Sequence, residues 1–258
     1  MHIDQANIFN LKSLWEKYGS KTQNIDKGNV KLEQPKLYIN DLWPYRCWFD
    51  DAITSHDFSW LSNIPKTTIF PIWHLHNEKK NTAQTSIEFE LIENKLQKKH
   101  WHCILEQTAM FLALSNDTDE YRVEPRIGFT IKRVNTSQDI TLWLDIVSEA
   151  FGYSIEREVI EKLIDEPDMR ILIAYQNSQA VASAILYKTG DIIGIHQVGV
   201  KLDYQGKGVA RTFMKEIIST CYSWQGKSIV LQASCSGKPL YEQLGFKTQF
   251  LIKSYQRQ

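Results

Sequence analysis

The stretch that decides the fold is VGVKLDYQGKGVARTF, from Val198 to Phe213. It begins with alternating apolar residues, passes through Gly206 and Gly208, and continues into a helical pattern. A strand that ends in a glycine turn and then starts a helix points unpaired backbone N–H groups at the space above the turn. The helix dipole makes that space favourable for an anion, so the turn predicts a phosphate-binding site.

Three phosphate-binding patterns compete for this turn. The dinucleotide pattern G-x-G-x-x-G needs a third small residue where this chain has Arg211, and it needs parallel strands where this chain predicts hairpins. A P-loop needs a hydroxyl directly after its lysine, but Lys207 is followed by Gly208. The remaining pattern is Q-x-x-G-x-A, formed by Gln205, Gly208 and Ala210.

The periodicity around the turn predicts an α+β unit. A strand from Phe129 to Val134 precedes a helix with Ser137 as its N-cap, and a short second helix follows. Residues 170–200 are typical of three strands joined by tight turns, so this part of the sheet is expected to be antiparallel. After the glycine turn come a helix, a strand, a short helix closed by Gly245 at its C′ position, and a last strand. The predicted order is β-α-α-β-β-β-α-β-α-β.

This half of the chain, about residues 128–256, resembles the GNAT superfamily of N-acetyltransferases. The family's acetyl-CoA signature, R/Q-x-x-G-x-G/A, matches Gln205 to Ala210 and follows a strand that ends in V-x-V, here Val198 to Val200. The family's LY-x-x-x-GF pattern follows about thirty residues later, at Leu240 to Phe246. The resemblance implies a mixed, mostly antiparallel sheet flanked by helices.

The resemblance also implies an acetyl-CoA site. Main-chain groups at the end of the strand would bind the pantetheine arm, and the amides from Gly206 to Ala210 would hold the diphosphate, with Lys207 and Arg211 adding positive charge. Ser234 stands where the family often has asparagine, seven residues before Tyr241, and its hydroxyl is expected to reach the coenzyme. The coenzyme-binding residues expected are Val198, Gly199, Val200, Gln205, Gly206, Lys207, Gly208, Val209, Ala210, Arg211 and Ser234.

The implied reaction is aminolysis of a thioester, in which an amine must lose a proton and the leaving sulfur must gain one. Tyr241 is the candidate donor, because a phenol with an ordinary pKa of about 10 stays protonated at neutral pH. His196 precedes Val198 by two residues, which predicts a shared strand face and makes it the candidate base. A hydrogen-bonded structural histidine is the alternative interpretation.

The connection AFGYS lies where this family commonly shapes its acceptor site. Phe151 and Tyr153 predict an apolar wall there, and the sequence does not identify the acceptor. Glu149 and Glu156 flank the connection. They are interpreted as solvated helix residues rather than as bases.

The first half is rich in aromatic residues, since six of the eight Trp lie before residue 115, and it is predicted to form a second α/β lobe. A polar stretch places the boundary near Glu124, which gives an N-terminal lobe of residues 1–124 and an acetyltransferase domain of residues 125–258. The lobe is hypothesised to be a degenerate copy of the same fold. Two helices are expected from Ile8, Leu11, Trp15 and Tyr18, and from Ile87, Leu91, Ile92 and Leu96. Strands are expected at 37–39, 68–73 and 102–105.

Composition argues against several classes of partner. Lys+Arg and Asp+Glu both number 30, which gives no electrostatic support for binding nucleic acid or a membrane surface. No apolar run approaches the length of a membrane span or a secretion signal, so a cytoplasmic location is expected. The four cysteines form no C-x-x-C pair and are expected to be reduced. The pairs His74/His76 and His100/His102 are interpreted as packing and surface residues, and no metal is expected.

These observations predict an N-acetyltransferase that moves an acetyl group from acetyl-CoA to a primary amine of a small molecule, amino acid or peptide, as a monomer or homodimer. Two alternatives remain open. One is a tandem-lobed acyl or aminoacyl transferase that uses a larger donor. The other is a protein that binds acyl-CoA without turnover.

Overall fold

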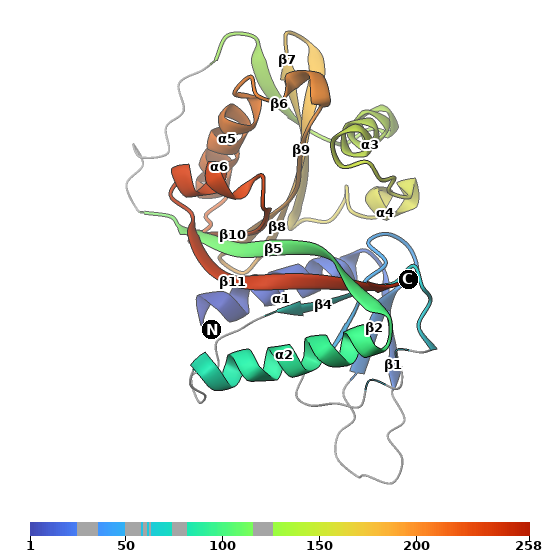
Figure 1. Ribbon diagram of the computed structural model, residues 1–258. Helices are drawn as coiled ribbons and strands as arrows, with labels where there is room; N and C mark the ends of the chain where they lie inside the picture. Colours follow the sequence, from blue (N-terminus) through green and yellow to red (C-terminus); the bar gives the residue numbers. More distant parts are fainter. Residues whose placement is uncertain (25–35, 50–57, 59–60, 62, 74–81, 116–125) are drawn as a thin grey trace.

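The computed structural model describes residues 1–24, 36–49, 58, 61, 63–73, 82–115 and 126–258 (Figure 1). The helices are α1 (Ile3–Lys17), α2 (Thr82–Lys98), α3 (Ser137–Phe151), α4 (Arg157–Glu161), α5 (Val209–Ser223) and α6 (Lys238–Gln243). The earlier strands are β1 (Ser20–Asn24), β2 (Lys36–Asn40), β3 (Cys47–Phe49), β4 (Ile69–Trp73) and β5 (Trp101–Ala113). The later strands are β6 (Phe129–Arg133), β7 (Met169–Gln176), β8 (Gln179–Thr189), β9 (Ile192–Val200), β10 (Ser228–Ser234) and β11 (Lys247–Arg257).

Eight of these strands form one open sheet, in the order β4-β11-β5-β10-β9-β8-β7-β6. Neighbouring strands are antiparallel except for β9 and β10, which run parallel. Short turns join β7 to β8 and β8 to β9, as the sequence predicts for hairpins. The predicted α+β class with a mostly antiparallel sheet is confirmed, and the element order from β6 to β11 is the predicted one.

A strand from the first half of the chain lies inside this sheet. β5 separates β10 from β11 and pairs antiparallel with both, and Figure 1 shows β5 and β11 side by side across the middle of the molecule. β4 extends the same sheet beyond β11. The predicted boundary near residue 124 falls outside the described residues, and strands from both sides of it share the sheet. The strands β1, β2 and β3 form a separate three-stranded sheet.

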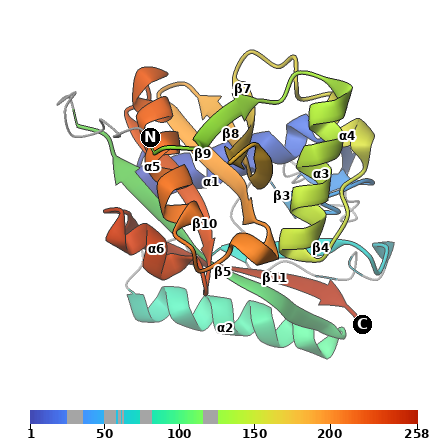
Figure 2. The same ribbon diagram turned by 90° about the horizontal axis from the view of Figure 1, so that it is seen from above.

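Helices cover both faces of the large sheet (Figure 2). On one face, Phe213 of α5 packs in a core cluster with Ile193 and Ile195 of β9. On the other face, α1, α3 and α4 share a second cluster that includes Leu14 and Trp143. Successive side chains of a strand point to opposite faces, so the side chains of β9 point alternately toward α5 and toward α1.

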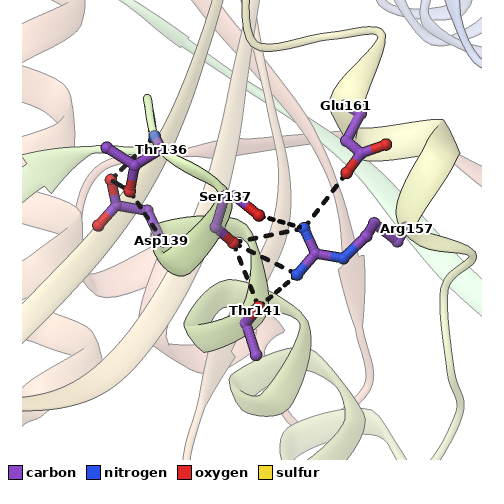
Figure 3. Close-up of polar contacts among 6 residues, drawn as sticks. All are labelled: Thr136, Ser137, Asp139, Thr141, Arg157 and Glu161. Carbon is purple, nitrogen blue, oxygen red and sulfur yellow. Dashed lines mark hydrogen bonds and ion pairs between the residues drawn. The ribbon is translucent and has the colours of Figure 1, made fainter.

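The N-cap of α3 is Thr136 rather than the predicted Ser137. Thr136 accepts a hydrogen bond from the Asp139 N–H at 3.1 Å, and the Asp139 carboxylate accepts from the Thr136 N–H at 3.1 Å. This reciprocal capping box requires an acidic residue three positions after the cap, a condition that Thr136 meets and Ser137 does not. The Arg157 guanidinium then ties α4 to the start of α3, through hydrogen bonds to the Ser137 carbonyl oxygen and to Thr141 (Figure 3).

The two helices predicted in the first half are present as α1 and α2. In α2, Ile92 and Leu96 are buried as expected, but Ile87 and Leu91 are 56% and 55% exposed. Adjacent residues are about 100° apart around a helix, so Leu91 and Ile92 do not face the sheet together. The predicted helix is confirmed, with Ile92 and Leu96 on its buried face and Ile87 and Leu91 exposed.

Candidate functional site

Strands β9 and β10 separate at their carboxyl ends. Their parallel pairing stops at Leu231↔Ile195, although both strands continue for several residues. Gln197 has a left-handed φ of 52° and interrupts the register between β9 and β8. Val198 has no Cα partner in either neighbouring strand. The strand-like contact of Val198 with pantetheine stays a prediction.

The glycine turn brings open backbone to the start of α5. Gly206 and Gly208 have φ values of 70° and 80°, a conformation that favours glycine, and a Cβ on either would meet no atom within 4 Å. Gln205 Nε2 donates to the Val200 carbonyl oxygen at 2.9 Å and closes the loop. Gly208 is the N-cap of α5 and offers no side chain, and the first turn contains no acidic residue. The N–H groups of this turn are therefore directed at the space above it.

A cavity of about 280 Å³ opens over the turn. It is lined by Val200, Tyr204, Gln205, Gly206, Gly208, Val209, Ala210, Arg211 and Leu240. The structure thus gathers most of the predicted coenzyme-binding residues around one cavity. A larger hollow of about 570 Å³, between α5 and the strands β6 and β7, is lined by none of them.

The two predicted cations lie close to this cavity. Lys207 Nζ is 5.9 Å from the centroid of the Tyr204 ring, and Tyr204 lines the cavity. Arg211 lines the cavity itself, and its guanidinium donates to the Gln243 Oε1 atom of α6. Both residues therefore add positive charge near the start of α5.

Two predicted coenzyme residues make contacts within the protein. A Cβ at Gly199 would lie 2.8 Å from Phe151 Cε2, so glycine allows β9 to approach α3 closely. Ser234 Oγ accepts from the Gly237 N–H at 3.1 Å and closes the turn before α6. Direct contacts of Gly199 and Ser234 with a coenzyme stay predictions.

Tyr241 lies on α6, directly after the cavity residue Leu240. Its ring packs against Phe246 in an edge-to-face arrangement, with the centroids 5.8 Å apart. Burial raises the pKa of the Tyr241 phenol to about 12. The hydroxyl therefore remains a hydrogen-bond donor throughout the neutral pH range.

His196 does not share a strand face with Val198, and that prediction is wrong. The left-handed residue Gln197 adds one residue to β9 and reverses the alternation, as a β-bulge does. Val198 packs on the α5 side, whereas the Nε2 atom of buried His196 lies 3.1 Å from Asn10 Oδ1 of α1. Burial lowers the pKa of the imidazole to about 4, and a hydrogen bond with the Gln232 side chain partly opposes this. These contacts fit the alternative interpretation, a hydrogen-bonded structural histidine.

Aromatic residues from both halves of the chain gather beside the bulge. The Tyr153 ring stacks with Phe151 at 5.6 Å and with Trp43 at 6.4 Å, and its hydroxyl donates to Gln197 Oε1 at 2.8 Å. Phe151 and Tyr153 are 40% and 38% exposed. We call Trp43, Phe151 and Tyr153 the aromatic wall. The sequence predicts the last two, but no local spacing connects Trp43 to them.

The two flanking glutamates both accept hydrogen bonds. Glu149 is exposed on α3, as the interpretation of a solvated helix residue expects, whereas Glu156 is half-buried at the N-cap of α4. Glu156 accepts from the Tyr45 hydroxyl and from the Trp43 N–H, the latter at 3.1 Å. Burial raises the pKa of this carboxyl, but hydrogen bonds from Tyr45, from its own backbone and from the Trp43 N–H outweigh the burial, so the pKa is lowered. Glu149 accepts from the Leu202 N–H at 2.9 Å and holds the chain directly after β9. Trp43 and Tyr45 are thus site residues that the sequence reasoning missed.

The other groups singled out in the sequence do not line this cavity where the structure describes them. His74 and His76 fall outside the described residues, and His102 is exposed on β5. Among the residues that the structure describes, no three His, Cys, Asp or Glu side chains are arranged to hold a metal ion. All four cysteines are unpaired thiols, with Cys47 and Cys221 buried. No helix in the described ranges combines the length and apolar character needed to cross a membrane.

Comparisons with known proteins identify a domain in the second half of the chain. The model of the acetyltransferase (GNAT) domain matches residues 131–254. A GCN5-related N-acetyltransferase from Kribbella flavida has a TM-score of 0.60 at 12% identity, over 98% of this chain and 94% of that chain. A functionally unknown conserved protein from Staphylococcus epidermidis gives 0.59 at 17% identity, over 90% and 94%. No curated protein matches the sequence.

A GCN5-related N-acetyltransferase from Sphaerobacter thermophilus has a TM-score of 0.54 at 16% identity, and here the match covers 74% of this chain and only 59% of that one. At these identities the similarity to solved structures shows the fold alone. The GNAT fold indicates acyl transfer from acyl-CoA. Residues 131–254 are thus identified as an acetyltransferase (GNAT) domain, and the chain shares its fold with GNAT structures.

Proposed function

We propose that the protein transfers an acetyl group from acetyl-CoA to a primary amine of a small molecule, amino acid or peptide. The observation that carries the proposal is the cavity of about 280 Å³ over the uncapped start of α5, lined by the Q-x-x-G-x-A residues. A helix N-terminus favours an anion by only about 0.3–1 kcal/mol at an exposed site. Several N–H groups directed at the same phosphate oxygens add to this, so a diphosphate suits the turn better than a single carboxylate does.

The pantetheine arm would lie along the free end of β9. Val200 lines the cavity, and Val198 has no Cα partner in either neighbouring strand, so the proposed route from the cavity to the gap follows this strand. An extended amide chain can pair with the exposed peptide groups as an added strand does. The thioester would then lie where β9 and β10 part, within the reach of groups from both strands.

In the proposed reaction the amine nitrogen attacks the thioester carbonyl carbon, a C–N bond forms, and the C–S bond breaks. The nitrogen loses one proton and the CoA sulfur gains one, so the products are an acetamide and the free thiol. Tyr241 would donate to the sulfur, because burial keeps its phenol protonated. His196, with a pKa lowered to about 4, is a weak proton acceptor at neutral pH. We therefore expect kcat/KM to rise with pH toward the pKa of the amine, about 10.4 for an alkyl amine.

The acceptor would approach beside the aromatic wall. Phe151 and Tyr153 keep exposed ring surface, and Tyr153 is bonded to Gln197 in the bulge of β9. An amine that carries an apolar or aromatic group would bury that surface. Tyr153→Ala is therefore expected to raise the KM of the acceptor about tenfold with little change in the KM of acetyl-CoA. Phe9→Ala, which removes an exposed ring from α1, is the matched control. Equal acceptor KM values in the two variants would contradict this approach route.

The direct test is turnover with acetyl-CoA and a panel of amines, followed by release of free thiol and by mass spectrometry of the product. Acetylated amine formed at the rate of thiol release supports the proposal. Tight binding of acetyl-CoA without product would support an acyl-CoA-binding protein instead. Activity only with a charged tRNA or another larger donor would support the tandem-lobed alternative.

A further inference from the structure

Asn10 of α1 is buried against the sheet and bonded through both ends of its amide. Its Nδ2 donates to the Tyr187 carbonyl oxygen and to Thr189 Oγ1, both at 3.0 Å. Its Oδ1 lies 3.1 Å from His196 Nε2. Because the amide nitrogen already faces two acceptors, the oxygen faces the imidazole, and Nε2 is the donor. Asn10 therefore holds His196 as the Nε2–H tautomer.

Asn7, one helical turn earlier, is bonded in the same way to the next strands. Its Nδ2 donates to Gln249 Oε1 at 2.6 Å and to the Met110 carbonyl oxygen at 3.2 Å, and its Oδ1 accepts from Gln232 Nε2 at 2.7 Å. Residues three apart are separated by about 4.5 Å along a helix. Neighbouring strands are separated by about 4.8 Å. One face of α1 therefore reaches β9 through Asn10 and β10 through Asn7.

The two strand residues of this network lie where the strands part. His196 and Gln232 directly follow the last residue pair of the β9–β10 ladder. Gly194 permits the close approach of α1, since a Cβ there would lie 1.8 Å from Asn10 Oδ1. Helix α1 is thus hydrogen-bonded to both β9 and β10 at the point where they separate, on the sheet face opposite α5.

We propose that Asn7, Asn10, His196 and Gln232 are positioning residues that fix the separation of β9 and β10 for the thioester arm. This inference rests on the proposed function of the gap. Buried amides bonded at both ends fix a distance, because a hydrogen bond weakens outside a narrow range of length and angle, whereas apolar contacts tolerate sliding. A misplacement of about 1 Å can cost about 100-fold in rate. A helix outside the matched segment 131–254 would then set the geometry of the reacting group.

The first test compares Asn10→Ala with Asn40→Ala. Asn40 is also buried and bonded to α1, since its Nδ2 donates to the Trp15 carbonyl oxygen at 2.9 Å, but it lies on β2 and outside the gap. Both variants should lower the melting temperature by a few degrees, because each leaves buried polar groups unpaired. Only Asn10→Ala should lower kcat/KM for acetyl-CoA, by about 10- to 100-fold. Equal kcat/KM per folded protein in the two variants would overturn the proposal.

A pair of substitutions at His196 separates positioning from proton transfer. His196→Gln keeps an amide N–H near the place of Nε2, whereas His196→Leu removes the donor. Positioning predicts that His196→Gln retains most of kcat while His196→Leu loses it. If both variants lose kcat equally, and with it the same limb of the pH profile, His196 acts on protons and the proposal fails.

A ligand-free measurement keeps this inference separate from the proposed function. Hydrogen exchange of the amides in 196–200 and 232–234 should be faster in Asn10→Ala than in the wild type, and unchanged in Asn40→Ala. Unchanged exchange in Asn10→Ala would overturn the positioning role even in an active enzyme. Absence of acetyl-CoA binding by the wild type, together with the expected exchange pattern, would overturn only the proposed function.

Discussion

At the scale of single residues, the phenol of Tyr241 is the group whose ionisation matters most for the proposed chemistry. Burial raises its pKa to about 12, so the acid form persists well above neutral pH. The donor is lost only as the pH rises through that value. Because a thiol has an ordinary pKa of about 8.5, complete transfer of this proton to a free thiolate is uphill. The phenol therefore stabilises the leaving group by donating a hydrogen bond as negative charge develops on the sulfur.

Tyr241→Phe should lower kcat by about 100-fold or more, in the range expected for loss of a hydrogen-bond donor to developing negative charge. The ring contact with Phe246 is preserved, so the Kd of acetyl-CoA measured by calorimetry should change by less than about threefold. Tyr175→Phe, which removes a hydroxyl from β7, is the control and should leave both values unchanged. An unaltered kcat in Tyr241→Phe would exclude its role as the donor.

His196 makes stability depend on pH. Burial lowers its pKa from 6.5 to about 4. Between pH 4 and pH 6.5 the imidazole is therefore protonated in the unfolded chain and neutral in the folded chain. The contribution of His196 to the free energy of unfolding should therefore be complete above pH 6.5, and about 3 kcal/mol of it should be lost as the pH drops to 4. Urea unfolding of the wild type and of His196→Gln across this range isolates the effect. Parallel pH dependences in the two proteins would contradict it.

At the scale of elements, the turn before α5 combines two left-handed glycines with an uncapped helix. This arrangement follows from the local residue types, which is why the sequence alone predicts the turn and the helix after it. For the same reason it predicts that Gly245, with a φ of 88°, closes the C-terminal end of α6. Two local features were not predictable in the same way. Ser137 and Thr136 are both good caps until Asp139 is considered, and glutamine at position 197 is no signal for the positive φ that reverses β9.

Gly208→Ala and Gly190→Ala form a matched pair for this turn. Both glycines have positive φ, 80° and 65°, and a Cβ on either meets no atom within 4 Å. Each substitution should cost about 1–2 kcal/mol of stability through backbone strain alone. Only Gly208→Ala places a methyl group over the first turn of α5, so only this variant should weaken acetyl-CoA binding, by about tenfold, in calorimetry. Equal Kd values in the two variants would place the diphosphate elsewhere.

At the scale of the whole molecule, the two halves of the sequence share one sheet, and side chains from both halves contact each other beside the candidate site. β5 lies between β10 and β11, α1 supports the gap, and Trp43 completes the aromatic wall. Hydrophobic periodicity predicts that such elements exist, but it carries no information on which distant strands pair, so the position of β5 was not predictable from the sequence. Whether the predicted lobes 1–124 and 125–258 fold independently is tested by expressing them as separate chains.

Residues 126–258 expressed alone should not show a cooperative thermal transition. Without β5, the inner edges of β10 and β11 lose their partner and become exposed strand edges. Co-expression with residues 1–115 as a second chain should restore a cooperative transition, which controls for the cut itself. A stable 126–258 fragment that binds acetyl-CoA as the full chain does would instead support an independent domain after residue 125.

The central claim is that acetyl-CoA binds across the start of α5 and the gap between β9 and β10. The most direct measurement is electron density for acetyl-CoA in a co-crystal. The account predicts diphosphate oxygens within about 3 Å of the N–H groups that follow Gly208, and a pantetheine amide paired with Val198. Density in the larger hollow beside β6 and β7, or no density at saturating acetyl-CoA, would contradict it.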